Sequence, residues 1–297
     1  MKMKKLYSFL VSLLVIPFSA NIGLGSLYFY SEIALFTKEA KATNWNAFNL
    51  NFKKGNRYLN SGEYQKALDA YNKVIKIYAL DGPSFYNRGT AYLGLGKYDE
   101  AIKDFLKSIK YDNEKGNQFA YNNISVAYDN LGDYKNALKY INLAIDAYPK
   151  SGLYFQNRGY YNLELENYKE AEKDYKKAKE VYLKNKSTRM YADCPKVKNL
   201  EHCKLDSWFY NSLGLAKENL GNFNGALDNY NKAIEINFPK EEEEKYIWFN
   251  NRGNVKYELG DERGACKDYK FAASIGDEEG VEWLKSKDGK WCGKMEF

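Results

Sequence analysis

The same pattern of residues recurs six times along this chain, and this repetition constrains its fold more than any other feature. Each copy contains an Asn-Arg-Gly triplet or a near relative of it, with aromatic residues at fixed offsets. The third residue of the triplet marks the register at Gly55, Gly89, Ser125, Gly159, Gly214 and Gly253, with intervals of 34, 36, 34, 55 and 39 residues. A period of 34 residues is typical of helix-turn-helix units that stack into an array.

Within each copy, small and large residues alternate in a way that predicts two closely packed helices joined by a turn. Seven residues after the register mark, five copies have a Gly, which supplies the left-handed backbone that ends a helix. Twelve residues after the mark every copy has an Ala, and a large apolar residue and a mostly small one follow it. Small residues at this spacing let helices approach closely while aromatic side chains fill the space between them.

At these positions the chain resembles the tetratricopeptide repeat (TPR) family, in particular its bacterial members, over roughly residues 48–276. The resemblance implies an all-α fold, a right-handed superhelical solenoid of about six TPR helix-turn-helix repeats. Two copies depart from the family pattern. Repeat four has Asn162 where Tyr is usual and Glu166 in place of the helix-ending Gly, and repeat six has Glu262 where an aromatic residue is usual. We expect these two repeats to pack less regularly.

The repeat pattern divides the chain into five parts. They are a signal peptide or membrane anchor with its linker (1–42), repeats one to four (43–183), a basic insertion (184–206), repeats five and six (207–276), and a capping helix with a tail (277–297). Asp277, Glu278 and Glu279 favour a helix start, and Val281 and Leu284 can share one face against repeat six. We therefore expect a terminal helix over 277–287, with Trp283 at its flank.

Composition agrees with a helical array and disfavours nucleic acid as a partner. Five prolines leave long helices uninterrupted, and 28 Tyr and 16 Phe supply bulk for a core shared between neighbouring repeats. Tyrosines can form a stacking platform for single-stranded nucleic acid, but many of these fall at core positions of the repeat. The net charge of +6 is modest and does not by itself require an anionic partner.

The first 42 residues predict export. Three lysines within residues 1–5 precede 26 residues without any charge, Leu6 to Ser31. A basic start before such an apolar run is an export signal, and both a cleaved signal peptide and a retained anchor fit it. A buried core helix is less favoured, because little in a helical array could cover so apolar a segment. We expect the repeats in the periplasm, a lumen-like compartment or the exterior, with membrane contact only through this segment.

The insertion accounts for the long interval of 55 residues and carries two of the four cysteines, Cys194 and Cys203. In an oxidising compartment a disulfide between them could close the loop, whereas free thiols are the alternative. A zinc site on Cys194, His202 and Cys203 lacks a fourth ligand. Pairing of Cys266 with Cys292 depends on how the tail folds back. The insertion has a net charge of +3. A basic loop of this kind can contact an acidic partner or lipid head groups, but it is more often simply solvated, and we favour that interpretation.

Motifs of catalysis are absent from the sequence. It contains no Gly-x-x-x-x-Gly-Lys-Ser/Thr, no Gly-x-Ser-x-Gly and no His-Glu-x-x-His. His202 is the only histidine and lies in the insertion, where a catalytic geometry would be hard to hold. We therefore expect a non-enzymatic protein without catalytic residues, cofactor or metal.

The TPR resemblance places the partner on the inner face of the curved array. The register gives that face the second, fifth, sixth, ninth and twelfth residues of each first helix. The candidate partner-binding residues are Tyr86, Asn87, Asn122, Asn123, Gln156, Asn157, Tyr160, Trp208, Asn211, Asn250 and Asn251. Lys53 is the only cation at the inner positions, which argues against nucleic acid and against the carboxylate clamp of chaperone adaptors.

Side-chain amides form two rows among these candidates. One row is Asn122, Gln156, Asn211 and Asn250, and the other is Asn87, Asn123, Asn157 and Asn251, broken by Ser212. An amide offers a donor and an acceptor together, so it can bond a peptide main chain whatever its side chains are. The rows are similar to the asparagine ladder of the O-linked N-acetylglucosamine transferase repeats. A local packing preference of the TPR repeat is the alternative explanation.

The sequence thus predicts a TPR scaffold, exported or membrane-anchored, that holds an extended peptide segment of a protein partner in its groove, in assembly or envelope processes. The alternative from another class is self-association, in which the array builds a homo-oligomer or a membrane-tethered structural element. A measurement of mass in solution separates the two.

Overall fold

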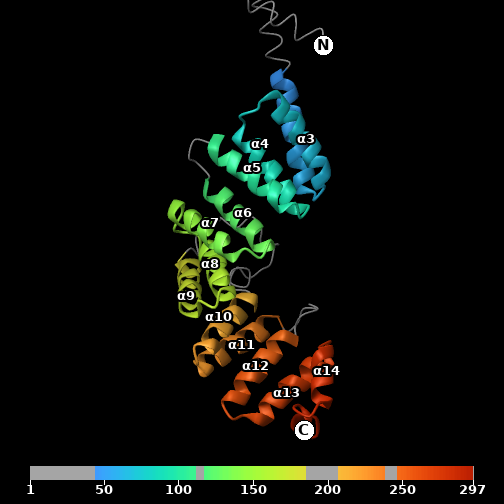
Figure 1. Ribbon diagram of the computed structural model, residues 1–297, viewed down its shortest axis with the longest axis vertical. Coiled ribbons are helices and arrows are strands. Elements are labelled where there is room, and N and C mark those ends of the chain that lie inside the picture. The colour runs from blue at the N-terminus through green and yellow to red at the C-terminus, as the bar shows by residue number, and fades with distance from the viewer. Residues whose placement is uncertain (1–43, 112–116, 185–206, 238–245, 297) are drawn as a thin grey trace, which may run out of the picture.

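The computed structural model describes residues 44–111, 117–184, 207–237 and 246–296, and these residues form helices joined by short turns (Figure 1). The chain is helical from residue 44 to residue 60. The helices that follow are α3 (Tyr64–Ile77), α4 (Gly82–Gly94), α5 (Tyr98–Tyr111), α6 (Asn117–Asn130), α7 (Tyr134–Ala147), α8 (Gly152–Glu164), α9 (Tyr168–Lys184), α10 (Ser207–Asn219), α11 (Phe223–Asn237), α12 (Tyr246–Glu258), α13 (Glu262–Ser274), α14 (Glu278–Lys285) and α15 (Lys290–Gly293). The predicted all-α fold is confirmed.

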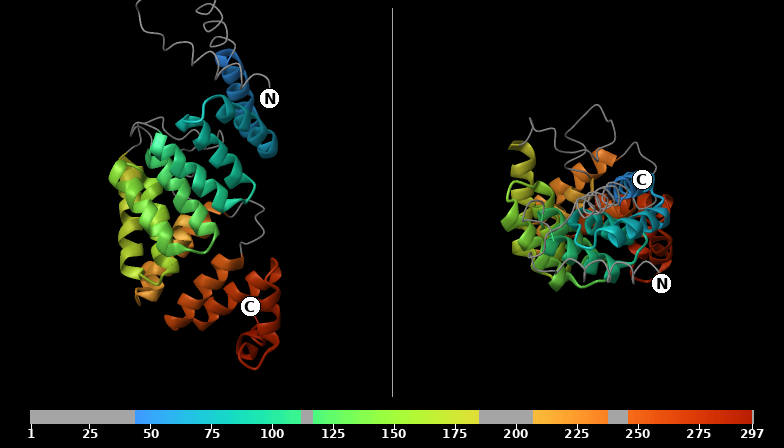
Figure 2. Two further views of the ribbon diagram at one scale, coloured as in Figure 1. Left: turned by 45° about the horizontal axis from the view of Figure 1, so that its top comes forward. Right: turned by 90° about the horizontal axis from the view of Figure 1, so that it is seen from above.

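Consecutive helices pack as pairs, and each pair packs on the next. The helix over 44–60 and α3 form the first repeat, and α4 with α5 through α12 with α13 form the other five. The second helix of each repeat contacts the first helix of the next. Figure 1 shows the pairs in succession along the long axis, and the right view of Figure 2, along that axis, shows them displaced around it. The result is the superhelical array predicted from the repeat period.

The first helices line the inner side of the array. Among the described residues, α4 contacts α6, and α10 contacts both α8 and α12, whereas second helices of successive repeats have no comparable contact. The array therefore closes on the side of the first helices. This agrees with the face that the TPR register assigns to a partner.

The register glycines are required because an aromatic ring of the second helix lies directly on them. A Cβ on Gly89 would lie 2.9 Å from the Phe105 ring, and Gly214 faces Tyr230 at 2.6 Å in the same way. These rings are fully buried and hold the two helices of a repeat together. Repeat three has Ser125 at this position and the smaller Ile141 opposite it, so the extra side-chain atoms on one helix are compensated on the other.

The turn inside repeat four closes in the same way as the other turns, although Glu166 replaces the usual Gly. Glu166 has a φ of 60°, close to the 70° of Gly96 in repeat two. Its N–H donates to Leu163 O at 2.9 Å, and the following N–H donates to Asn162 O at 2.8 Å. The same two bonds close the repeat-two turn at 3.0 and 2.9 Å. The prediction of less regular packing is therefore wrong for this turn, because the backbone bonds impose the left-handed conformation on a non-glycine residue.

The turn and the second helix of repeat six begin in the regular way. Gly260 takes the left-handed backbone with a φ of 82°, and Asp261 then caps α13 by accepting a 2.8 Å hydrogen bond from the Gly264 N–H. Glu262, which stands where an aromatic residue is usual, is exposed in the first turn of α13. An N-cap side chain thus fixes the start of the helix without an aromatic contact. Tyr269 is half-buried, whereas the matching side chains of the other repeats are buried, in line with the less regular packing expected for this repeat.

The C-terminal end of the array carries the predicted capping helix. Asp277 caps α14 by accepting a 3.0 Å hydrogen bond from the Gly280 N–H, and α14 ends at Lys285, two residues before the predicted end. The Trp283 ring packs on Tyr269 of repeat six at 5.1 Å between ring centroids. A disulfide joins Cys266 of α13 to Cys292 of α15, and both residues are fully buried. The tail therefore folds back onto repeat six and is covalently fixed there.

Two other parts of the sequence analysis lie outside the described residues. They are the N-terminal export segment and the insertion with Cys194 and Cys203. Within the described ranges, no helix combines the length and apolar character needed to cross a bilayer.

Candidate functional site: the inner face of the first helices

The inner face carries four rows of side chains that run from repeat to repeat across the first helices, two of amides, one apolar and one acidic. The amide rows occupy the fifth and sixth positions of each helix, in its middle. We call the exposed Phe119, Leu153 and Trp208 at the second position the apolar row. The fourth row, of carboxylates, lies in the last turn of the first helices. Each row is described in turn.

The amide row that comprises Asn87, Asn123, Asn157 and Asn251 forms hydrogen bonds to the preceding repeat. Asn157 Nδ2 donates to Asn122 Oδ1 at 3.0 Å, and Asn251 Nδ2 donates to Asn211 Oδ1 at 2.9 Å. In repeat two, Asn87 Nδ2 donates to Asn56 Oδ1 at 3.1 Å. One donor of each amide therefore joins two repeats, as the packing explanation requires.

The remaining members of the amide rows have structural contacts of different kinds. Asn123 Nδ2 donates to the Tyr86 hydroxyl at 3.1 Å, and Gln156 Oε1 accepts from the Tyr182 hydroxyl at 2.9 Å. Asn250 Nδ2 donates to the Asp277 carboxylate at 2.8 Å and so ties repeat six to the cap. The rows are thus linked to the scaffold at every repeat that contains them.

Part of the hydrogen-bonding capacity of the amides stays available. Within the described residues, the Oδ1 atoms of Asn157 and Asn251 accept no hydrogen bond, and each Nδ2 uses one of its two hydrogens, whereas the Asn87 amide also bonds the Tyr71 hydroxyl. These three side chains are partly exposed, whereas Asn211 is buried. The structure thus fixes the orientation of Asn157 and Asn251 through one bond each and leaves an acceptor and a second donor free on both.

The apolar row lies about one helical turn before the amide positions, and its side chains are exposed. Phe119 is 49% exposed, Leu153 43% and Trp208 43%, which is unusual for side chains of this size. Trp208 lies edge-on against the buried Trp248, with 5.9 Å between ring centroids, so it is supported from behind. Tyr160, by contrast, is half-buried between Tyr134 and Tyr161.

Carboxylates form a row that the sequence analysis missed. We call Asp129, Glu164, Glu218 and Glu258, in the last turn of the first helix of repeats three to six, the acidic row. In the described part of the chain none of the four forms an ion pair. A signal was present in the sequence, since an acidic residue recurs at the twelfth or thirteenth position of four successive first helices.

Neighbouring carboxylates of the acidic row repel one another. Burial raises the pKa of the Asp129 carboxyl, and the nearby Glu164 raises it further. Burial also raises the pKa of Glu218, and Glu258 adds to the effect, whereas a hydrogen bond from the Tyr230 hydroxyl at 2.5 Å opposes it. Negative charge on this row is therefore costly unless a cation approaches it.

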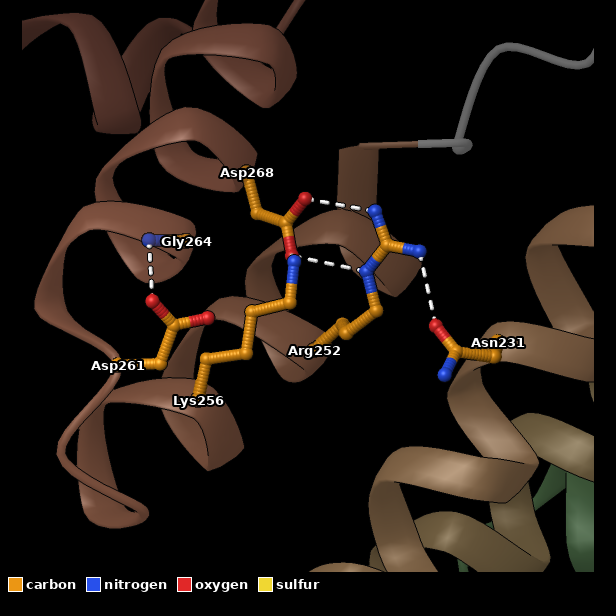
Figure 3. A network of polar contacts seen from close by, with 6 residues as sticks. All are labelled: Asn231, Arg252, Lys256, Asp261, Gly264 and Asp268. Carbon is orange, nitrogen blue, oxygen red and sulfur yellow. Dashed lines mark hydrogen bonds and ion pairs between the residues drawn. The ribbon is translucent and has the colours of Figure 1, made fainter.

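A second feature that the sequence analysis missed is an arginine clamp in repeats two, four and six. Figure 3 shows the clamp of repeat six. In repeat six, Arg252 donates to both oxygens of Asp268 at 2.8 and 2.6 Å, and its third nitrogen donates to Asn231 of the preceding repeat at 3.0 Å. Lys256 adds an ion pair with Asp268 at 2.7 Å. The signal in the sequence was the constant separation of 16 residues between Arg and Asp. The clamp thus leaves its charges paired inside the scaffold.

Sequence models of the tetratricopeptide repeat family match residues 48–79, 83–114, 120–151, 154–185 and 209–239. These segments make up more than half of the chain, and the chain therefore belongs to the tetratricopeptide repeat family. The first five helix pairs correspond to the matched segments, and α12 with α13 adds a sixth pair of the same form. No curated protein matches the sequence significantly.

Solved structures with the same fold are distant in sequence. A tetratricopeptide repeat protein from Parabacteroides merdae is 18% identical, with a TM-score of 0.59 over 85% of this chain and 94% of its own. YrrB, described as a TPR protein with an unusual peptide-binding site, is 19% identical, with a TM-score of 0.56 over 74% of this chain and 99% of its own. The MamA protein is 20% identical, with a TM-score of 0.51 over 65% and 93%. At these identities the likeness concerns the fold alone.

Proposed function

We propose that this chain is a non-enzymatic scaffold that holds an extended segment of a protein partner along its inner face. The observation that carries the proposal is the combination of amides oriented by the scaffold with a row of exposed apolar side chains beside them. Asn157 and Asn251 are each fixed by one hydrogen bond and retain an acceptor and a donor. Such groups suit a peptide main chain, and exposed aromatic side chains are typical anchors at protein interfaces.

We further propose that the protein works outside the cytoplasm, exported or anchored by its N-terminal segment, in assembly or envelope processes. The basic start and the uncharged run Leu6 to Ser31 motivate this. The disulfide between Cys266 and Cys292 supports it, because structural disulfides persist in oxidising compartments. A reporter fused after Asn46 should appear across the membrane, and a soluble cytoplasmic reporter would contradict export.

Site-specific photo-crosslinking in native cells tests the binding face. A photo-reactive amino acid replaces Leu153 on the inner face or, as the matched control, Leu106 on α5, which is 42% exposed on a second helix. We expect a crosslink to one partner protein from position 153 and none from position 106. Crosslinks only between copies of this chain would favour self-association, and equal crosslinking from both positions would contradict binding at the inner face.

A further inference from the structure

We propose that the inner face of repeats three to six selects a basic segment, in which Lys or Arg side chains lie on one side of the peptide and apolar side chains on the other. This inference rests on the proposed function and adds the chemical class of the partner. It is carried by two rows of different chemistry at opposite edges of the same face. One row is apolar and exposed, and the other is acidic and unpaired.

The two rows are far enough apart for a peptide to lie between them. The apolar row occupies the second position of the first helices, and the acidic row begins ten residues later, at Asp129 in α6 and Glu218 in α10. Ten residues of α-helix span about 15 Å. The amide rows lie between these edges, and the bond from Asn157 to Asn122 places them side by side in consecutive repeats. A peptide main chain on the amides would thus have an apolar edge on one side and an acidic edge on the other.

An extended peptide matches this arrangement because its successive side chains point in opposite directions. When the main chain lies on the amides, one set of side chains reaches Phe119, Leu153 and Trp208. The other set reaches the carboxylates.

In the residues that the structure describes, the acidic row has no counter-charge of its own, whereas the buried carboxylates of the arginine clamp do. Asp104, Asp174 and Asp268 are each paired with an arginine of the clamp. Asp129, Glu164, Glu218 and Glu258 form no ion pair in the residues that the structure describes. The chain as a whole has a net charge of +6, so this row is opposite in sign to the rest of the molecule. A cation on the partner would remove the mutual repulsion of these carboxylates.

The apolar row points to a ligand independently of charge. Three large side chains at the same position of three consecutive repeats are each more than two-fifths exposed. The rigid support of Trp208 by the buried Trp248 gives one of them the character of a binding anchor. A partner that supplied only charge would leave this row in water.

Selection from an array of random twelve-residue peptides tests the inference with the full chain. The variant Asp129→Asn/Glu164→Gln/Glu258→Gln removes three charges from the acidic row. It keeps Glu218, which accepts a hydrogen bond from the Tyr230 hydroxyl. The matched control Glu100→Gln/Glu170→Gln/Glu262→Gln removes three exposed charges from second helices. A third variant, Leu153→Ser/Trp208→Ser, removes two of the three side chains of the apolar row.

We expect the wild-type chain to enrich peptides that contain both Lys or Arg and apolar residues. The acidic-row variant should lose the enrichment in Lys and Arg and bind the best basic peptide roughly tenfold more weakly, which corresponds to ~1.4 kcal/mol. The control variant should bind like the wild type, and added salt should weaken only the binding that depends on the acidic row.

Other outcomes overturn the inference in distinguishable ways. Peptides captured through the apolar row with no preference for Lys or Arg would overturn the basic class and leave the proposed function standing. Equal losses in the acidic-row and control variants would assign the effect to net charge and also overturn the inference. If the wild-type chain captured peptides no better than the Leu153→Ser/Trp208→Ser variant does, both this inference and peptide binding at the inner face would be overturned.

Discussion

Arg158 in α8 and Asp174 in α9 form a bidentate ion pair, with Nε and Nη2 donating to the two carboxylate oxygens at 2.9 and 2.6 Å. The remaining nitrogen of Arg158 donates to Asn142 of repeat three at 2.8 Å. The same arrangement recurs with Arg88 in repeat two and Arg252 in repeat six. Odd repeats supply the Asn and even repeats supply the Arg and the Asp, so the clamp joins repeats one to two, three to four and five to six.

We expect Arg158→Leu to destabilise the array by about 3 kcal/mol, because it leaves the Asp174 carboxylate buried and without a cation. Asp174 is only 5% exposed at its side chain, so water does not replace the arginine. The double variant Arg158→Leu/Asp174→Asn copies Leu213 and Asn229 of repeat five, and it should lose about 1 kcal/mol. Urea denaturation measures both. A double variant as unstable as the single one would contradict the clamp as the cause.

The register glycines give a second reciprocal test. Gly89→Ser would place a side chain on the Phe105 ring, which a Cβ would meet at 2.9 Å, and should cost about 2 kcal/mol. Adding Phe105→Ile reproduces the Ser125 and Ile141 pair of repeat three and should recover part of this loss. Gly159→Ser is the matched control, since Tyr175 lies further away there, at 3.3 Å. Additive losses in the double variant would show that the two positions do not compensate.

The repeats and the cap could be predicted from the sequence because their signals are local. A helix-ending Gly, an invariant Ala and the aromatic positions fix each helix pair, and the charged start of 277–279 indicates α14. Hydrogen-bond partners in different repeats were harder to predict from the sequence. The sequence placed Asn157 and Asn251 on the correct face but not their bonds to Asn122 and Asn211, because the residue that faces each amide belongs to another repeat 35 or 40 positions away.

The missed features have the same physical origin. The arginine clamp joins residues of three helices, and each half looks like a solvated surface charge when a single helix is considered. The acidic row becomes apparent only when the last turns of four first helices are placed side by side. The expectation for Glu166 was wrong because propensity at one residue was weighed without the two backbone bonds that close its turn.

Glu166→Gly should stabilise repeat four. Glu166 holds a left-handed backbone with a φ of 60°, which costs an L-residue about 1 kcal/mol relative to Gly. Part of that gain is offset by the greater chain entropy of Gly in the unfolded state, so we expect a net gain of about 0.5 kcal/mol in urea denaturation. The reciprocal variant Gly132→Glu should lose stability at a turn with open space for a side chain. Unchanged stability in both would indicate that the backbone conformation carries no cost.

The disulfide of the cap should contribute measurably to stability. Cys266 and Cys292 are separated by 26 residues, and a crosslink over such a loop stabilises by about 3 kcal/mol through the entropy of the unfolded chain. We expect Cys292→Ser to lower the unfolding temperature and to increase hydrogen exchange in α13 to α15 first. Repeat three, at a distance from the cap, serves as the internal control, and equal exchange in both regions would contradict a local role of the bond.

Asp129→Asn tests the cost of negative charge on the inner face through its pH dependence. The pKa of Asp129 is raised in the folded state, first by burial and then by Glu164, so the folded protein holds its proton more tightly than the unfolded chain does. Stability from this group is fully present below the unfolded value of 3.8 and is lost as the pH rises through the raised folded pKa. The variant removes this loss, and we therefore expect it to be more stable than the wild type at pH 7, by about 0.5 kcal/mol, with no gain at pH 3. Asp99→Asn, at an exposed first-turn position of α5, is the control for removing one charge. A gain at pH 7 that persists unchanged at pH 3 would assign the effect to packing and not to the ionised carboxylate.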